Sequence, residues 1–338
     1  MEHSFIENKH SEVYVKSKAC KAASINFQLT SSIDKNKILF TLSNLILEYQ
    51  EEILENNLLD INHAKSLGYT NSQLDRLSLD EKRIEQLSKS VLDIIKLEDP
   101  IGQIIETFIR PNGLEIHKKR VPLGVIAIIY ESRPNVTIDA SILAIKTGNC
   151  VILRGGKEAI NTNIYLTSLI KNALVLNNFN PDVVQIIENT DRKLAIELMH
   201  MNQFIDVLIP RGSASLINTV LENSTIPVIE TGVGNCHIFV DETADLQMAK
   251  SIILNAKVQR PSVCNAVETV LVHKNISEQL FEILIPSLLE NQVELYVSND
   301  ILENYPNLIQ ATENDWNTEY LDLKLAIKTV NNVDEAIK

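Results

Sequence analysis

Cys264 is the side chain whose surroundings most favour nucleophilic chemistry in this sequence. It lies in a short polar stretch between a helical pattern and an apolar strand pattern, and Pro261 ends the helix just before it. Lys257 and Arg260 come shortly before the thiol. Nearby cations lower the pKa of a thiol and so favour the reactive thiolate. The local sequence leaves two interpretations open, an accessible nucleophile or a small buried side chain.

Two glycine-containing turns each follow an apolar run and open a helical pattern, which places their backbone N–H groups to bind an anion. Neither turn matches the GxGxxG pattern of common dinucleotide sites, and each alone is compatible with an ordinary strand–helix turn. Two such turns in one α/β region favour a nucleotide site. The candidate residues are Arg154, Gly155, Gly156 and Lys157 in the first turn, and Arg211, Gly212 and Ser213 in the second.

Two further polar groups follow apolar runs. Glu230 leads a glycine-rich turn that continues with Thr231 and Gly232, where a carboxylate can act as an acid or base, bind a ribose, or face solvent. Arg133 and Asn135 come after the apolar run that ends at residue 130. We expect them at the carboxyl end of a strand, where open α/β sheets bind their ligands.

Composition excludes several classes of protein. The chain has 338 residues, typical of two domains, and a formal net charge of −13, which gives it no electrostatic reason to bind nucleic acid or anionic lipid. Its four cysteines share no CxxC spacing and its seven histidines no HExxH spacing, so no metal site is expected. The polar N-terminal ten residues lack the apolar core of a signal peptide. We therefore predict a cytoplasmic protein.

The first hundred residues have helical periodicity, in one stretch that runs from a polar start at 31–34 to residue 54 and another over 78–97. Residues 104–110 and 114–120 then predict two strands joined through Asn112-Gly113, a strong hairpin signal. This hairpin, with its charged second strand, is either a solvated edge or an arm for assembly.

From residue 121 onward, apolar runs alternate with helical patterns, which predicts an α/β fold with parallel sheets covered on both faces. One of the helices is expected over 139–147, with Asp139 as its N-cap and Gly148 just beyond its end. The predicted strands are 121–130, 150–154, 183–187, 204–210, 226–230, 237–241, 267–272 and 324–330.

Several long motifs resemble the gamma-glutamyl phosphate reductases, or glutamate-5-semialdehyde dehydrogenases, a branch of the aldehyde dehydrogenase superfamily. The resemblance implies a Rossmann-type cofactor domain over 1–103 and 121–231, an oligomerisation hairpin over 104–120, and an α/β catalytic domain over 232–338. The motifs that carry it are residues 110–114, 121–136, 209–213, 227–237, 255–269 and 312–322.

The resemblance also implies residue roles. Cys264 matches the catalytic thiol, and the two glycine-containing turns match the phosphate-side loop and the pyrophosphate turn of the cofactor site. Glu230 falls where hydrolytic relatives carry a general base, and Glu319 where they hold the nicotinamide ribose. Roles at the oxyanion and the leaving phosphate are implied for Arg133, Asn135, Arg260 and Asn265.

The implied reaction is the NADPH-dependent reduction of L-glutamyl 5-phosphate to L-glutamate 5-semialdehyde and phosphate through a Cys264 thioester, the second step of proline biosynthesis from glutamate. Arg154 and Lys157 are candidates for the 2′-phosphate of NADPH. Because water would hydrolyse the thioester, we expect Glu230 to bind cofactor or substrate rather than to activate water. Expected partners are a second copy of the chain and glutamate 5-kinase.

Two alternatives remain. A hydrolytic aldehyde dehydrogenase would resolve the same thioester with water instead of phosphate. An inactive fragment is the other alternative, because family members continue beyond Lys338 and their further residues would complete the catalytic domain.

Overall fold

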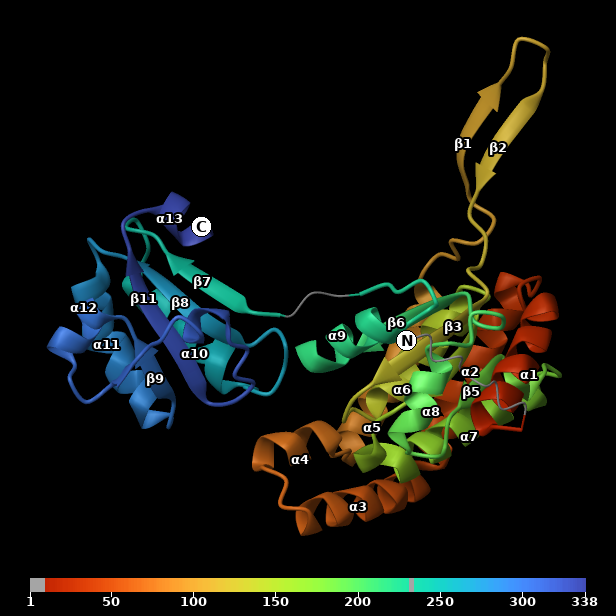
Figure 1. Cartoon of the computed structure of the whole chain (residues 1–338), viewed down its shortest axis with the longest axis horizontal. Helices are drawn as coiled ribbons and strands as arrows, with labels where there is room; N and C mark the ends of the chain where they lie inside the picture. The colour runs from red at the N-terminus through yellow and green to blue at the C-terminus, as the bar shows by residue number, and fades with distance from the viewer. Residues whose placement is uncertain (1–9, 231–233) are drawn as a thin grey trace, which may run out of the picture. The chain divides into compact units, whose positions relative to one another are not determined.

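The computed structural model describes residues 10–230 and 234–338. The chain forms two compact units (Figure 1). Unit 1 comprises Met1–Tyr69 and Arg76–Thr231, and unit 2 comprises Thr70–Asp75 and Gly232–Lys338. Among the described residues, no helix is both long and apolar enough to cross a membrane.

The first hundred residues are helical, as predicted. The long stretch that was expected to end at residue 54 is divided at Tyr49, which ends one helix and precedes the next. Ser11, Ser31 and Asp80 cap three of the helices by accepting a hydrogen bond from a backbone N–H in the first turn. The helices are α1 (Glu12–Phe27), α2 (Ser32–Glu48), α3 (Gln50–Ser66), α4 (Asn71–Leu77) and α5 (Glu81–Lys96).

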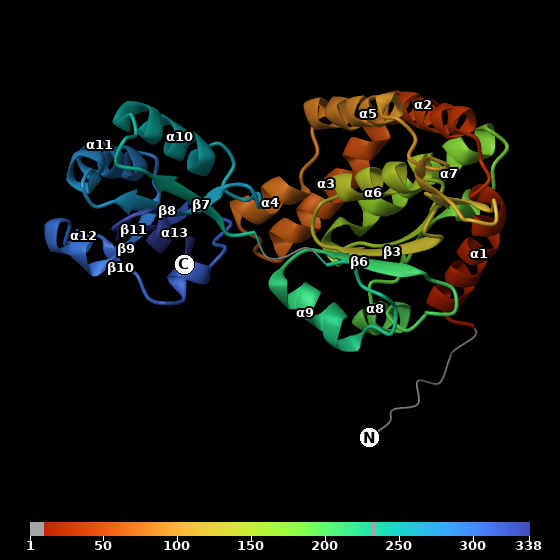
Figure 2. The same cartoon turned by 90° about the horizontal axis from the view of Figure 1, so that it is seen from above.

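Unit 1 contains a parallel four-stranded sheet in the order β5-β4-β3-β6. Figure 2 shows α6, with α2 and α5 beyond it, on one side of this sheet and α8 and α9 on the other. The direction of winding reverses between β3 and β6, and such switch points are where open α/β sheets bind ligands. The elements are β3 (Val125–Tyr130), α6 (Asn135–Lys146), β4 (Cys150–Arg154), α7 (Ile160–Leu176), β5 (Val184–Ile186), α8 (Arg192–Leu198), β6 (Val207–Arg211) and α9 (Ala214–Asn223).

The structure corrects three predicted elements. The strand expected over 121–130 begins only at Val125, and the strand expected over 226–230 is reduced to one isolated bridge between Val228 and Leu208. Asp139 is not an N-cap, because Pro134 lets α6 begin at once and Asp139 instead lies inside the helix, where it accepts a hydrogen bond from Asn135.

Gly148 is confirmed as the residue just beyond the end of α6. Its φ of +68° lies in the left-handed region, which glycine adopts without strain. The N–H of the following residue, Asn149, reaches back to the carbonyl of Ala144, 2.9 Å away, and so satisfies the end of the helix.

The predicted hairpin is confirmed as β1 (Ile104–Ile109) and β2 (Glu115–Lys119), which pair antiparallel (Figure 1). Gly113 has a φ of +83° in the connecting turn, so the Asn-Gly signal identified the turn correctly. Both strands are exposed along their whole length.

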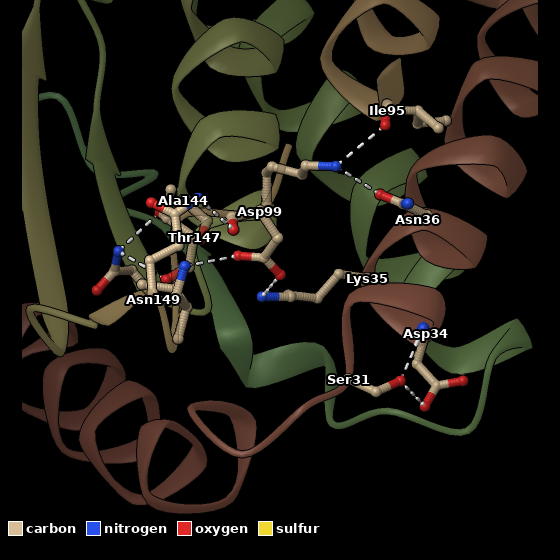
Figure 3. A network of polar contacts seen from close by, with 12 residues as sticks. Ser31, Asp34, Lys35, Asn36, Ile95, Asp99, Ala144, Thr147 and Asn149 are labelled. Carbon is tan, nitrogen blue, oxygen red and sulfur yellow. Dashed lines mark hydrogen bonds and ion pairs between the residues drawn. The ribbon is translucent and has the colours of Figure 1, made fainter. Parts of the chain in front are cut away.

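A buried polar network joins α2, α5 and α6 to the residues that precede the hairpin (Figure 3). Lys35 is almost fully buried and forms an ion pair of 2.5 Å with Asp99, whose other carboxylate oxygen accepts the N–H of Ile101. Lys146 donates to the side chain of Asn36 and to the carbonyl of Ile95. Every charged group in this network therefore has a partner, as burial requires.

Unit 2 has a parallel five-stranded sheet in the order β10-β9-β11-β8-β7. The sequence predicted three of these strands and missed β9 and β10, because both are short and lack a clear apolar alternation. The elements are β7 (Cys236–Val240), α10 (Leu246–Val258), β8 (Val267–His273), α11 (Ser277–Glu290), β9 (Glu294–Val297), α12 (Asn299–Asn304), β10 (Ile309–Gln310), β11 (Lys324–Val330) and α13 (Val333–Ile337).

Candidate active site

A cleft of about 520 Å³ opens in unit 1 where β3 and β6 end. Of the seven residues predicted for the two anion-binding turns, four line this cleft, and Arg211, Gly212 and Gly155 lie beside it in the chain. The sequence missed the carboxylates Glu131 and Glu158, which also line it. The predicted residues in the lining are Arg154, Gly156, Lys157 and Ser213.

The second turn already holds an internal anion. Glu131 follows β3, and its carboxylate accepts both the backbone N–H and the hydroxyl of Ser213, each at 2.9 Å. Ser213 is the N-cap of α9, so this carboxylate lies at the positive end of the helix dipole. A side chain at Gly212 would lie 2.7 Å from the same carboxylate, so glycine makes room for it.

The first turn has a similar arrangement. The Glu158 carboxylate accepts hydrogen bonds from the backbone N–H and the hydroxyl of Ser132, at 2.9 Å and 2.5 Å. Ser132 has a φ of +37°, which non-glycine residues rarely adopt. A Cβ at Gly156 would lie 2.2 Å from a Glu158 oxygen. In the second turn a carboxylate therefore occupies the donors of Ser213, whereas beside the first turn Glu158 supplies the carboxylate and Ser132, which follows β3, supplies the donors.

Arg154 lies at the end of β4 and is only 7% exposed. Its guanidinium donates to the carbonyls of Gly155 and Thr190, while its buried Nε has no hydrogen-bond partner in the described structure. Burial lowers the pKa of Arg154, against the opposing effect of nearby Glu158. A buried cation with an unused donor beside this cleft suits a ligand that carries negative charge, as a dinucleotide does.

Gly155 has a packing role. A Cβ there would come within 2.3 Å of Asn163 Nδ2 and 3.1 Å of the Tyr130 ring. Only glycine therefore lets the strand and the helix approach this closely beside the cleft. Lys157, the other predicted cation of the first turn, lines the cleft and is exposed.

In unit 2, Cys264 lies in the loop between α10 and β8, and its side chain is exposed. Of the two interpretations that the local sequence left open, the structure shows the accessible side chain, whereas Cys20 and Cys150 are buried. The loop lies at the amino ends of β7 and β8. The unit 1 cleft, by contrast, opens at the carboxyl ends of the strands of its own sheet.

The two cations that precede Cys264 are bound to carboxylates. Lys257 is fully buried and pairs with Glu268 at 2.7 Å, and Arg260 pairs with Asp75 at 3.1 Å. Both cations therefore anchor the loop through these carboxylates, which accounts in part for their position just before Cys264 in the sequence. No local pattern indicates Asp75 as a partner, since it lies 185 residues before Arg260.

Glu319 and Cys264 both lie close to Gly234, although 55 positions separate them in the sequence. A Cβ at Gly234 would lie 3.6 Å from the Cys264 Cβ, 3.6 Å from a Glu319 carboxylate oxygen and 3.0 Å from the Cys264 carbonyl oxygen. The Cys236 thiol also contacts that carbonyl, at 3.3 Å. The structure therefore brings the predicted nucleophile and one predicted cofactor residue together around Gly234.

Cys236 also lies in this cluster, through the contact of its thiol with the Cys264 carbonyl. Burial raises the pKa of the Cys236 thiol, and the negative charges of Cys264, Glu268 and Glu319 raise it further. Next to it, Asn235 donates to the carbonyl of Trp316 at 3.0 Å, which ties the start of β7 to the segment before Glu319.

The remaining predicted residues are dispersed. Asn135 begins α6 and donates to Asp139, and Arg133 lies just before that helix, half-buried. Asn265 is exposed beside Cys264 in the same turn. Glu230 is exposed at the end of the described part of unit 1, and Thr231 and Gly232 lie outside the described residues.

The chain matches the family described as "Aldehyde dehydrogenase family" over residues 6–300. It is 50% identical over 327 residues to a gamma-glutamyl phosphate reductase of Caldanaerobacter subterraneus subsp. tengcongensis, covering 97% of this chain and 79% of the relative. It is 48% identical over 330 residues to a gamma-glutamyl phosphate reductase of Clostridium perfringens, covering 97% and 79%.

Solved structures give the same result. The crystal structure of gamma-glutamyl phosphate reductase from Thermotoga maritima matches with a TM-score of 0.87 and 44% identity, covering 97% of this chain and 79% of that one. The Saccharomyces cerevisiae enzyme of that name matches with a TM-score of 0.63 and 30% identity, covering 97% and 82%. An acetylating aldehyde dehydrogenase from Geobacillus thermoglucosidasius, 16% identical with a TM-score of 0.69, shares the fold.

Proposed function

Because the chain belongs to the aldehyde dehydrogenase family, in its gamma-glutamyl phosphate reductase branch, we propose that it reduces L-glutamyl 5-phosphate to L-glutamate 5-semialdehyde and phosphate. This is the second step of proline biosynthesis from glutamate. The observation that carries the proposal is that Cys264 is exposed and that its side chain and the Glu319 carboxylate both lie close to Gly234.

Cys264 is the nucleophile. Its thiolate attacks the acyl carbon of the substrate, the C–O bond to phosphate breaks, and inorganic phosphate leaves, so that a thioester remains on Cys264. A thioester accepts hydride more readily than a carboxylate does. After hydride addition the C–S bond breaks, which releases the aldehyde and restores the thiolate.

Two sets of donors assist the thiol. The backbone N–H of Cys264 and the side chain of Asn265 stabilise the oxyanion that forms at the attacked carbonyl, an effect worth several kcal/mol in such sites. Arg260, with Arg133 and Asn135, binds the leaving phosphate. Asp75 holds Arg260 through Nε, and a guanidinium has further N–H donors for an anion.

The cofactor is a nicotinamide dinucleotide, which supplies the hydride. Arg154, with its unused buried donor, and the turn at Gly212 and Ser213 hold its phosphates. Lys157 selects NADPH through the 2′-phosphate, because its side chain is exposed whereas Arg154 is buried and has only one unused donor atom. Gly155 and Gly156 keep the first turn open, and Arg211 adds charge beside the second.

Glu319 binds the nicotinamide ribose, while Glu230, Thr231 and Gly232 bind cofactor or substrate. A base that activates water would destroy the thioester, so Glu230 does not serve as one. In this respect the enzyme differs from hydrolytic aldehyde dehydrogenases.

The β1–β2 hairpin serves assembly in a cytoplasmic homo-oligomer that associates with glutamate 5-kinase. It exposes large apolar side chains, among them Phe108 and Ile109, which favour burial against a partner. Phe108→Glu should shift the protein toward monomer in analytical ultracentrifugation without lowering its unfolding temperature. Lys118→Glu, on the partner strand, is the charge-change control.

The test of function is oxidation of glutamate semialdehyde with NADP, followed by absorbance at 340 nm. We expect a strict requirement for phosphate and complete loss of activity in Cys264→Ser. A rate of oxidation that does not depend on phosphate would identify a hydrolytic dehydrogenase instead. Cofactor binding without thiol-dependent turnover would identify an inactive fragment.

A further inference from the structure

A buried ion pair closes the base of the Cys264 loop. Lys257 lies at the end of α10 and Glu268 near the start of β8, on either side of the loop, and both side chains are almost fully buried. Lys257 Nζ donates to Glu268 Oε2 at 2.7 Å and to the carbonyl of Val267 at 2.9 Å. The two ends of the loop are therefore held together beneath the thiol.

The second oxygen of Glu268 reaches a different loop. Glu268 Oε1 accepts the backbone N–H of Leu321 at 3.1 Å, two residues after Glu319. Leu321 has a φ of +53°, a conformation that costs a bulky residue energy and persists only where its surroundings impose it. One carboxylate is therefore bonded both to Lys257, just before the loop that carries the nucleophile, and to the loop that carries Glu319.

Stability alone is a poor reason for this pair. Burial raises the pKa of Glu268 and lowers that of Lys257, and their pairing opposes both shifts. Replacing buried ion pairs by apolar side chains of similar volume is often neutral for stability or even stabilising. What an apolar residue cannot replace is the acceptor that holds the Leu321 N–H.

We propose that Glu268 is a positioning residue that fixes the Glu319 loop relative to the Cys264 loop through its bond to Leu321. This inference rests on the proposed function for the roles of Cys264 and Glu319. Its structural part, that Glu268 sets the distance between these two side chains, stands independently of that function.

Two double variants separate the acceptor from the charge. Lys257→Met/Glu268→Gln and Lys257→Met/Glu268→Leu both remove the ion pair and leave no buried charge. The glutamine variant keeps an oxygen for the Leu321 N–H, whereas the leucine variant cannot. We expect kcat in the leucine variant to be about 100-fold below that of the glutamine variant, since misplacement by about 1 Å can cost this much. The KM for the dinucleotide should change less than about twofold.

The distance between the loops can be measured without turnover. In a Cys236→Ser/Glu319→Cys background, a short bifunctional thiol reagent such as dibromobimane should link position 319 to Cys264. Linking should persist with Lys257→Met/Glu268→Gln and become about tenfold slower with Lys257→Met/Glu268→Leu. Single alkylation by iodoacetamide corrects for any change in thiol reactivity.

The Lys35–Asp99 pair supplies the matched control, since Asp99 also holds a backbone N–H, that of Ile101, with its second oxygen. Lys35→Met/Asp99→Leu and Lys35→Met/Asp99→Asn should differ in unfolding temperature but not in kcat or linking. Equal kcat and equal linking in the two Glu268 variants would overturn the inference. A wild type with no phosphate-dependent turnover would refute the proposed function, while the linking rates would still decide whether Glu268 sets the distance.

Discussion

The Glu131 carboxylate accepts two hydrogen bonds from Ser213, one from its backbone N–H and one from its hydroxyl. These donors lie at the amino end of α9, where the family resemblance implies that a cofactor pyrophosphate binds. An internal anion and a bound phosphate would compete for the same groups. If the cofactor binds as proposed, the Glu131–Ser213 pair would oppose its binding.

Neutralising Glu131 should strengthen cofactor binding. We expect Glu131→Gln to lower the Kd for NADP about tenfold, equivalent to ~1.4 kcal/mol, because one repulsive charge is removed beside the phosphates. Fluorescence titration or calorimetry measures this change. Glu222→Gln, which makes the same charge change near the other end of α9, should leave the Kd within about twofold. Weaker binding by Glu131→Gln would mean that the carboxylate itself contacts the cofactor.

Two glycine substitutions should separate stability from activity. Gly155→Ala places a methyl group 2.3 Å from Asn163 Nδ2 in a packed region, and we expect a loss of about 1–3 kcal/mol in urea unfolding. Gly234→Ala places its methyl group 3.0 Å from the Cys264 carbonyl, so we expect a fall in kcat with little change in unfolding. A reversed pattern would refute the assignment of Gly155 to packing and Gly234 to the active site.

The Lys35–Asp99 pair predicts loss of stability in acid. Burial by itself raises the pKa of Asp99, but hydrogen bonds from Lys35 and the Ile101 N–H outweigh it, and the net pKa lies below the ordinary 3.8. The folded state therefore binds this proton less readily than the unfolded chain does. Its contribution to stability is complete above about pH 5 and is lost as the pH falls through the folded-state pKa.

Urea unfolding between pH 3 and pH 7 measures this dependence. In Lys35→Met/Asp99→Leu the slope below about pH 4 should decrease, because the linked group is gone. Asp34→Asn is the comparison, since the pKa of Asp34 is also lowered but Asp34 lies exposed at the start of α2, so we expect a smaller decrease in slope than in the double variant. An unchanged slope in the double variant would show that other carboxylates cause the acid sensitivity.

Cys236 should ionise only in alkaline solution. Its pKa is raised above the ordinary 9.0, first by burial and then by the negative charges around it. In Cys264→Ser, where Cys20 and Cys150 remain buried, alkylation of Cys236 by iodoacetamide should reach half its maximal rate above about pH 9. Adding Glu319→Gln should move this midpoint to lower pH, because one of the repulsive charges disappears. A midpoint that does not move would place Glu319 farther from Cys236.

Periodicity and turn chemistry predicted most of the fold. The helical first hundred residues, the Asn-Gly hairpin and the parallel sheets all carry local signals that the structure confirms. The failures have local causes as well. Pro134 started α6 earlier than the acidic N-cap signal at Asp139 indicated, and the apolar run at 226–230 makes only one bridge because it lies at the edge of a sheet.

The site was predictable only in part. Cys264 and the glycine turns stand out by residue type, but the partners that arrange them lie far away in the sequence. Glu131 and Ser213 are 82 positions apart, and Glu268 and Leu321 are 53 apart. Such contacts follow from sheet topology, which periodicity does not encode. No local pattern distinguishes a carboxylate that organises a loop from one that faces solvent.

The Asp75–Arg260 ion pair also bears on how the protein is made. Unit 2 includes Thr70–Asp75, a segment synthesised long before the rest of that unit, and Asp75 precedes its partner by 185 residues. During synthesis, Asp75 cannot pair with Arg260 until the Cys264 loop has emerged from the ribosome. The carboxy-terminal half expressed alone would lack it, so the nucleophile loop reaches its native anchoring only when both halves of the chain are present.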